Sequence, residues 1–137
     1  MLAASWSGHV QSEDFMNAFT QFLKTRGGAN GSQKILLLSQ IPRFEKHPLR
    51  ARRFATLGMP TDLPKCDCYM AANSAIKELA DKYEHVRYVD LTKLPLFDSA
   101  PMFKGTLTYH DEHHLNERGA EVYGKFAAPL LQKYIQF

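Results

Sequence analysis

The chain has 137 residues, of which 45% are hydrophobic and 23% are charged, and its net charge is +3. This length and composition predict one soluble globular domain with a core of ordinary size. The charge is too small to indicate a nucleic-acid partner. No apolar run approaches the roughly 20 residues of a membrane span. The first residues also lack the basic flank and apolar segment of a signal peptide.

The first part of the chain alternates between strand and helix signals. Residues 1–5 predict a short strand that is already buried where the chain begins, which indicates that earlier units of a longer fold are missing. Ser12 is a suitable N-cap for a helix that Gly27 and Gly28 end. Residues 34–40, with Ile-Leu-Leu-Leu at their centre, predict a buried strand of the parallel type.

A long irregular stretch is predicted over residues 42–65, because prolines punctuate it. Loops of this length in compact domains are often functional. The stretch contains a cluster of basic residues, which we interpret as a solvated loop, with an anionic ligand or membrane headgroups as the alternatives. The cluster comprises Arg43, Lys46, Arg50, Arg52 and Arg53.

The only cysteines, Cys66 and Cys68, form a lone Cys-x-Cys. Such close neighbours rarely pair comfortably, and no second cysteine pair is present to complete a zinc site. We therefore expect free thiols.

The later elements continue the alternation. Residues 67–83 predict a helix and residues 86–91 another short strand. Strands that alternate with helices predict a parallel sheet with helices on both faces. A brief extended piece at residues 106–109 precedes a last helix, which Asn116 caps and which should kink or restart at Pro129.

The stretch just before the last helix carries the strongest chemical signal. Asp111 lies three residues before His114, so on a turn the carboxylate can accept a hydrogen bond from one ring N–H and leave the other nitrogen as a base. His110, Glu112 and His113 could compete for the same roles, and spacing alone does not choose among them.

Two other interpretations of this stretch remain open. A polar, histidine-rich turn can simply precede a helix and cap it. Alternatively, His110, His113 and His114 could bind a metal together with Asp111. The stretch lacks a His-Glu-x-x-His pattern, however, and adjacent histidines point apart on most backbones. We therefore expect no metal.

The string Tyr-x-Asp-x-x-His-Leu-Asn-x-x-Gly-Ala at residues 109–120 resembles the last block of the SGNH hydrolase superfamily. The resemblance is closest to the SGNH domain that follows the membrane portion of acyltransferase family 3 proteins, the O-antigen and peptidoglycan O-acetylases. Ala4-Ser5-Trp6-Ser7, Ile41-Pro42, Tyr88-Val89-Asp90 and Tyr123-Gly124 also fit that branch. The resemblance covers essentially all 137 residues, although only the last block is specific.

This resemblance implies a three-layer α/β/α, flavodoxin-like parallel sheet without its first βα units, so residues 1–137 form a partial SGNH-like domain. It assigns Asp111 and His114 to the acid and base positions of a catalytic triad. The superfamily's Gly-Asp-Ser nucleophile block is absent here, and Trp6-Ser7-Gly8 stands where a Gly-x-Asn-Asp motif is often found. Trp6, Ser7 and Gly8 are therefore candidates for the pocket wall or the oxyanion hole, and the serine is expected outside this chain.

The function implied is part of a serine-dependent O-acyl transferase or esterase without a cofactor. Its partners would be an acyl donor, a carbohydrate acceptor and an upstream membrane acyltransferase domain. The domain would lie at the periplasmic or extracellular face of the membrane.

The alternative is a non-catalytic accessory or glycan-binding module that retains the fold, which the missing Gly-Asp-Ser favours. Loss of early strands would also expose a sheet edge, so we predict that a homodimer covers that edge.

Overall fold

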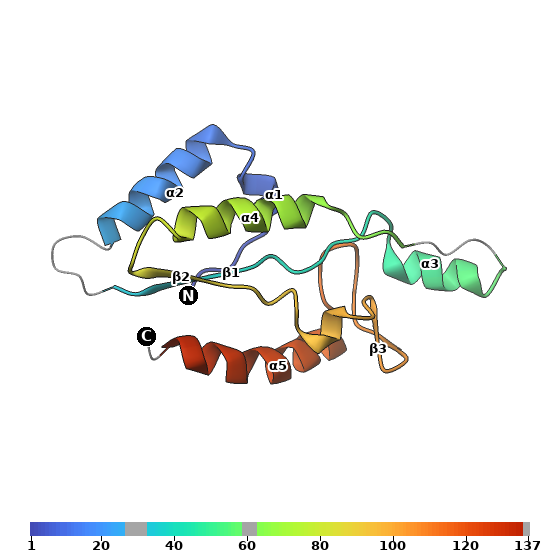
Figure 1. Cartoon of the computed structure of the whole chain (residues 1–137). Helices are drawn as coiled ribbons and strands as arrows, with labels where there is room; N and C mark the ends of the chain where they lie inside the picture. The colour runs from blue at the N-terminus through green and yellow to red at the C-terminus, as the bar shows by residue number, and fades with distance from the viewer. Residues whose placement is uncertain (27–32, 59–62, 136–137) are drawn as a thin grey trace. The chain divides into compact units, whose positions relative to one another are not determined.

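The computed structural model describes residues 1–26, 33–58 and 63–135 (Figure 1). By its internal contacts the chain divides into two compact units. The first unit comprises Met1–Gln40, Asp67–Leu91 and Leu131–Phe137, and the second comprises Ile41–Cys66 and Thr92–Leu130.

A small parallel sheet forms the centre of the first unit. Strand β1 (Ile35–Leu38) pairs in parallel with β2 (Val86–Val89). On the other side of β1, Leu2 makes a parallel bridge to Leu37. All four residues of β1 are buried, as expected for a strand that is covered on both faces. The predicted α/β class with a parallel sheet is confirmed.

Helices α1 (Trp6–His9), α2 (Glu13–Arg26) and α4 (Cys68–Ala80) lie on one side of this sheet (Figure 1). The Ser12 hydroxyl accepts a hydrogen bond from the Phe15 N–H at 3.2 Å, which confirms the predicted cap of α2. The predicted helix end at Gly27 and Gly28 lies outside the described residues. The buried core of this unit comprises Trp6, Leu23, Ile35, Leu37, Ala72, Ile76, Leu79, Ala80 and Val86.

The second unit contains the short elements: α3 (Pro48–Ala55), the 3-10 turn η1 (Pro95–Phe97), and the antiparallel strands β3 (Met102–Phe103) and β4 (Thr106–Leu107). Helix α3 corrects the prediction that residues 42–65 are irregular. Pro48 occupies the start of this helix, where the missing N–H costs nothing and the fixed φ favours the helical turn. A proline that we interpreted as an interruption therefore begins a helix.

Helix α5 (Glu117–Ile135) begins where the sequence predicts. The Asn116 side-chain oxygen accepts the Gly119 N–H at 2.8 Å and so caps the helix. The restart expected at Pro129 is not seen, because α5 is continuous through that residue. Among the helices of the described residues, none has both the length and the apolar character that crossing a membrane requires.

The cysteines correct another prediction. Cys66 and Cys68 are disulfide-bonded rather than free thiols. Asp67, between them, has φ −66° and ψ −14°. This helical backbone brings the flanking residues closer together than an extended one would. The sequence spacing alone did not reveal that turn.

Candidate active site

A closed loop in the second unit carries the predicted acid and base. Tyr109 and Leu115 form an antiparallel bridge across its base. One step further in, the His110 N–H donates to the His114 carbonyl at 2.8 Å. The loop therefore has a defined backbone although it contains no regular helix or strand.

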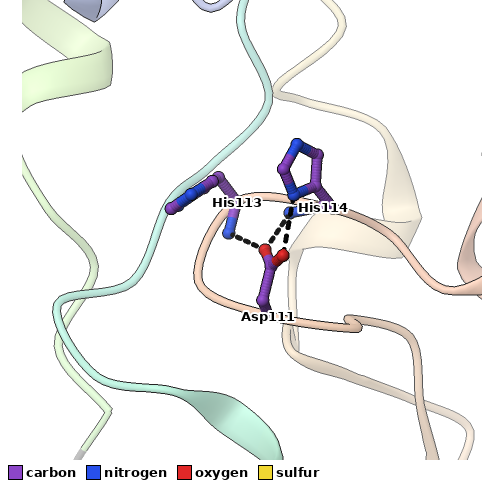
Figure 2. A group of neighbouring side chains, drawn as sticks. All are labelled: Asp111, His113 and His114. Carbon is purple, nitrogen blue, oxygen red and sulfur yellow. Dashed lines mark hydrogen bonds and ion pairs between the residues drawn. The ribbon is translucent and has the colours of Figure 1, made fainter.

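Asp111 organises the inside of this loop (Figure 2). Its Oδ1 accepts the backbone N–H groups of His113 and His114, each at 2.8 Å, and its Oδ2 lies 2.7 Å from Nδ1 of His114. An ionised carboxylate can only accept, so Nδ1 of His114 must carry the proton. In the neutral ring, Nε2 is then left as the acceptor.

The two side chains differ in exposure. The His114 side chain is 70% exposed and that of Asp111 is 24% exposed. The orienting carboxylate is thus partly covered, while the ring that it holds is open to another reactant. Of the residues that compete by spacing, the structure pairs Asp111 with His114. His110 is exposed and forms no side-chain hydrogen bond with either of them.

Two opposing effects act on the Asp111 carboxyl group. Burial raises its pKa, but the hydrogen bond from the His114 ring and the N–H donors of His113 and His114 lower it more strongly. The pKa of Asp111 therefore lies well below the ordinary range. The carboxylate stays ionised, which is the state needed to hold His114.

The loop is fixed to the segment that follows β1. The Tyr109 side chain is 1% exposed, and its hydroxyl donates to the Pro42 carbonyl at 2.8 Å. The Phe44 ring packs edge-on against Tyr109, with centroids 5.0 Å apart. The Phe44 N–H also donates to the Glu112 carbonyl at 2.9 Å. These contacts hold the loop on both sides of residue 43.

Arg43 adds a polar contact to this arrangement. Its Nη2 lies 3.3 Å from Nδ1 of His113, and its carbonyl accepts the Cys66 N–H at 2.9 Å. Because a guanidinium only donates, Nδ1 of His113 must accept and Nε2 must carry the proton. His113 and His114 therefore hold opposite tautomers. No sequence signal connects position 43 with position 113, so this role was missed.

The loop also brings together groups that could bind a metal. Ligand atoms of Asp111, His113 and His114 lie within 4.8 Å of one another (Figure 2). Both imidazoles are already engaged on one nitrogen, His113 by Arg43 and His114 by Asp111. An ion bound through Nδ1 of His113 would have to displace the Arg43 contact, whereas one bound through Nε2 of His114 would leave the Asp111 contact in place. The expectation that no metal binds at this cluster stays a prediction.

A family model described as the SGNH domain fused to AT3 domains matches residues 1–129. The chain belongs to this family. The family confirms the resemblance seen in residues 109–120. A search among curated proteins finds no match.

The fold of this chain is similar to that of a solved structure, described provisionally as a platelet activating factor from Streptococcus pneumonia. The likeness has a TM-score of 0.56 at 21% sequence identity and covers 86% of this chain. At that identity the likeness concerns the fold alone. This SGNH chain spans about half of that neighbour, since the match covers 50% of its length.

Trp6, Ser7 and Gly8 belong to the first unit, whereas Asp111 and His114 belong to the second. Trp6 is 3% exposed, and its ring N–H donates to the Leu38 carbonyl at 2.7 Å. Trp6 thus fixes α1 to the end of β1 as a core residue.

The Ser7 N–H, a candidate oxyanion donor, already has a partner in the SGNH domain. It donates to Oε1 of Gln40 at 2.7 Å, and Nε2 of Gln40 donates back to the Ser7 hydroxyl at 3.1 Å. The Gly8 N–H donates to the Ser5 carbonyl at 3.1 Å. Either N–H would have to exchange its partner before it could bind an oxyanion.

Gln40 is the centre of a buried polar network that sequence reasoning missed. Its N–H donates to Oδ1 of Asn73 at 2.7 Å, and Nδ2 of Asn73 donates to the Gln40 carbonyl at 2.9 Å. Both residues are buried. The available signal was a polar residue at the carboxyl end of a buried strand, which is where α/β folds place functional groups.

Proposed function

We propose that this SGNH domain supplies the acid–base pair of a serine-dependent acyl-transfer site, with the serine on sequence outside the 137 residues. The observation that carries the proposal is the 2.7 Å contact between Oδ2 of Asp111 and Nδ1 of His114, together with the exposure of the ring. A fixed tautomer and an accessible Nε2 are the requirements of a general base.

The steps assigned to this chain are proton transfers. Nε2 of His114 accepts the serine proton as the hydroxyl attacks the acyl carbonyl, and Asp111 stabilises the imidazolium that forms. His114 then returns the proton to the leaving alcohol. In the second half of the reaction, His114 takes a proton from water or from a sugar hydroxyl as that oxygen attacks the acyl carbonyl. His114 then returns the proton to the serine oxygen as the acyl–serine bond breaks.

The proposed substrate is an O-acetyl group on a surface carbohydrate. The support is the family, whose members are SGNH domains fused to AT3 domains. By that fusion we further propose an upstream membrane acyltransferase domain as partner, and a position at the periplasmic or extracellular face of the membrane.

The test compares acetyl release from p-nitrophenyl acetate and from an O-acetylated glycan by the longest gene product that contains this chain. We expect Asp111→Asn to lower the rate by about 10³–10⁴-fold, because the amide imposes the wrong tautomer on His114, and His114→Ala to do likewise. Unchanged rates in both variants would exclude the proposed pair.

The location of the serine is tested on the 137-residue chain itself. We expect no labelling by a fluorophosphonate, which reacts with activated serines. Labelling that disappears in Ser7→Ala or Ser5→Ala would show that the nucleophile lies within the chain and that this part of the proposal is wrong.

The second candidate is a glycan-binding or accessory module without catalysis. The absence of Gly-Asp-Ser from the sequence favours it. In that case acetylated glycan would bind the chain, and His114→Ala would leave the gene product's acetyl release unchanged.

We also propose that another strand covers the edge beside Leu2. The Leu2 N–H donates to the Leu36 carbonyl at 2.8 Å, and the Leu38 N–H donates to the Leu2 carbonyl at 2.9 Å. Backbone groups alternate in direction along a strand, so those of the exposed Ala3 face away from β1. In the isolated chain, a second copy is the proposed partner. A monomer in light scattering at all concentrations would contradict it.

A further inference from the structure

Helix α3 and the residues around it form a basic segment, defined here as residues 46–58. The segment contains four of the 17 lysines and arginines and none of the 14 acidic residues, although Glu45 immediately precedes it. The rest of the chain, with 13 basic and 14 acidic side chains, has a net charge of −1. The positive charge of this protein is therefore local.

Large apolar side chains are exposed on the same segment. Leu49 is 36% exposed, Phe54 41% and Leu57 71%. They are three of the seven large hydrophobic residues that are exposed among the described residues. Scattered exposed hydrophobics need no explanation, but a group of them on one short segment marks a contact surface.

Arginines and exposed apolar residues alternate along the helix. Leu49 and Arg53 are one helical turn apart, as are Arg50 and Phe54. Leu57 follows in the next turn, where its N–H donates to the Phe54 carbonyl at 2.9 Å.

The charges of this surface are not neutralised locally. Arg50, Arg52 and Arg53 are all exposed, and within the described ranges none of them forms an ion pair.

We propose that the basic segment binds the surface of a membrane that contains anionic lipids. Arg50, Arg52 and Arg53 would contact the lipid phosphates, and Phe54 and Leu57 would enter the boundary between headgroups and acyl chains. Segments that combine basic residues with exposed large apolar residues bind anionic membrane surfaces through both contributions. A soluble anionic glycan would satisfy the arginines but would leave Phe54 and Leu57 in water. An eight-residue helix is too short to span the bilayer.

Co-sedimentation with vesicles tests this directly on the 137-residue chain. We expect binding to phosphatidylcholine vesicles with about one third phosphatidylglycerol, weak binding to pure phosphatidylcholine, and release by added salt. The triple variant Arg50→Gln, Arg52→Gln, Arg53→Gln should lose about fivefold in partition coefficient for each charge removed. Phe54→Ser with Leu57→Ser should lose at least about tenfold.

Matched controls remove the same groups elsewhere. One control is the triple variant Lys24→Gln, Lys82→Gln, Lys133→Gln, which also removes three exposed positive charges. The other is Met70→Ser with Ile135→Ser, which removes two exposed apolar side chains. These controls should bind anionic vesicles like the unchanged chain, and circular dichroism should show that all variants are folded.

Three results would overturn the proposal. The first is absence of binding to anionic vesicles, or equal losses in the control variants. The second is that the Phe54 and Leu57 substitutions change neither vesicle binding nor a tight binding of heparin. That result would indicate a site for a soluble polyanion. The third is a dimer in analytical ultracentrifugation that substitutions in the basic segment dissociate, which would make this face an interface between copies.

Discussion

Nδ1 of His114 lies 2.7 Å from Oδ2 of Asp111, and the ring that it belongs to is largely exposed. The same carboxylate holds the loop backbone through its other oxygen. Asp111 therefore both shapes the loop and orients the imidazole, so the acid and the base are held together by contacts within the loop.

The pH dependence of stability should report the Asp111 carboxylate. Its pKa is lowered in the folded state. Burial raises this pKa, but the hydrogen bonds from His114 and His113 lower it by a larger amount. The unfolded chain then binds the proton more readily, so the stabilisation is complete above the ordinary carboxyl pKa and is lost as pH falls toward the folded value. Asp111→Asn should cost about 1–2 kcal/mol near pH 5, and this difference should shrink as pH falls toward 3.

The measurement is urea unfolding of the unchanged chain and Asp111→Asn at several pH values in that window. Asp81→Asn is a suitable control, because Asp81 is an exposed carboxylate with only a surface ion pair to Lys77. A difference for Asp111→Asn that grows as pH falls would contradict the lowered pKa.

Arg43 should fix the tautomer of His113. Its guanidinium donates to Nδ1 at 3.3 Å, which requires the proton on Nε2. In Arg43→Met, which keeps an unbranched apolar stem but removes the guanidinium, we expect the ¹⁵N chemical shifts of His113 to move toward a mixture of tautomers while those of His114 stay unchanged. Arg52→Met, on the exposed part of α3, should alter neither ring. Unchanged His113 shifts in Arg43→Met would contradict the contact.

The two glycines of α5 should respond in opposite ways to alanine. A Cβ on Gly119 would overlap the Thr108 carbonyl oxygen, whereas one on Gly124 would meet nothing within 4 Å. Gly119→Ala should therefore destabilise the fold by at least about 1–3 kcal/mol. Gly124→Ala should stabilise it by about 0.5–1 kcal/mol. Thermal unfolding of both variants measures this, and equal effects would be inconsistent with the close approach at Gly119.

Local features were predictable because they depend on neighbours in sequence. The Ser12 and Asn116 caps and the Asp111–His114 spacing all act within three residues. The buried run of β1 was predictable because a strand covered on both faces is apolar throughout.

Contacts between distant segments were not predictable in the same way. Arg43 meets His113 across 70 residues, and Gln40 meets Ser7 and Asn73 across 33 residues each. Periodicity and spacing contain no information about such pairs. The disulfide between Cys66 and Cys68 was missed for a different reason, since it depends on the helical backbone of Asp67.

The central claim is that Asp111 fixes the proton of His114 on Nδ1. Long-range ¹H–¹⁵N correlation spectra of the imidazole nitrogens, recorded on the chain above the pH of imidazole protonation, test it directly. We predict a protonated Nδ1 and an unprotonated Nε2 in His114, and the reverse in Asp111→Asn. An Nε2-protonated His114 in the unchanged chain, or spectra identical in the two proteins, would contradict the account.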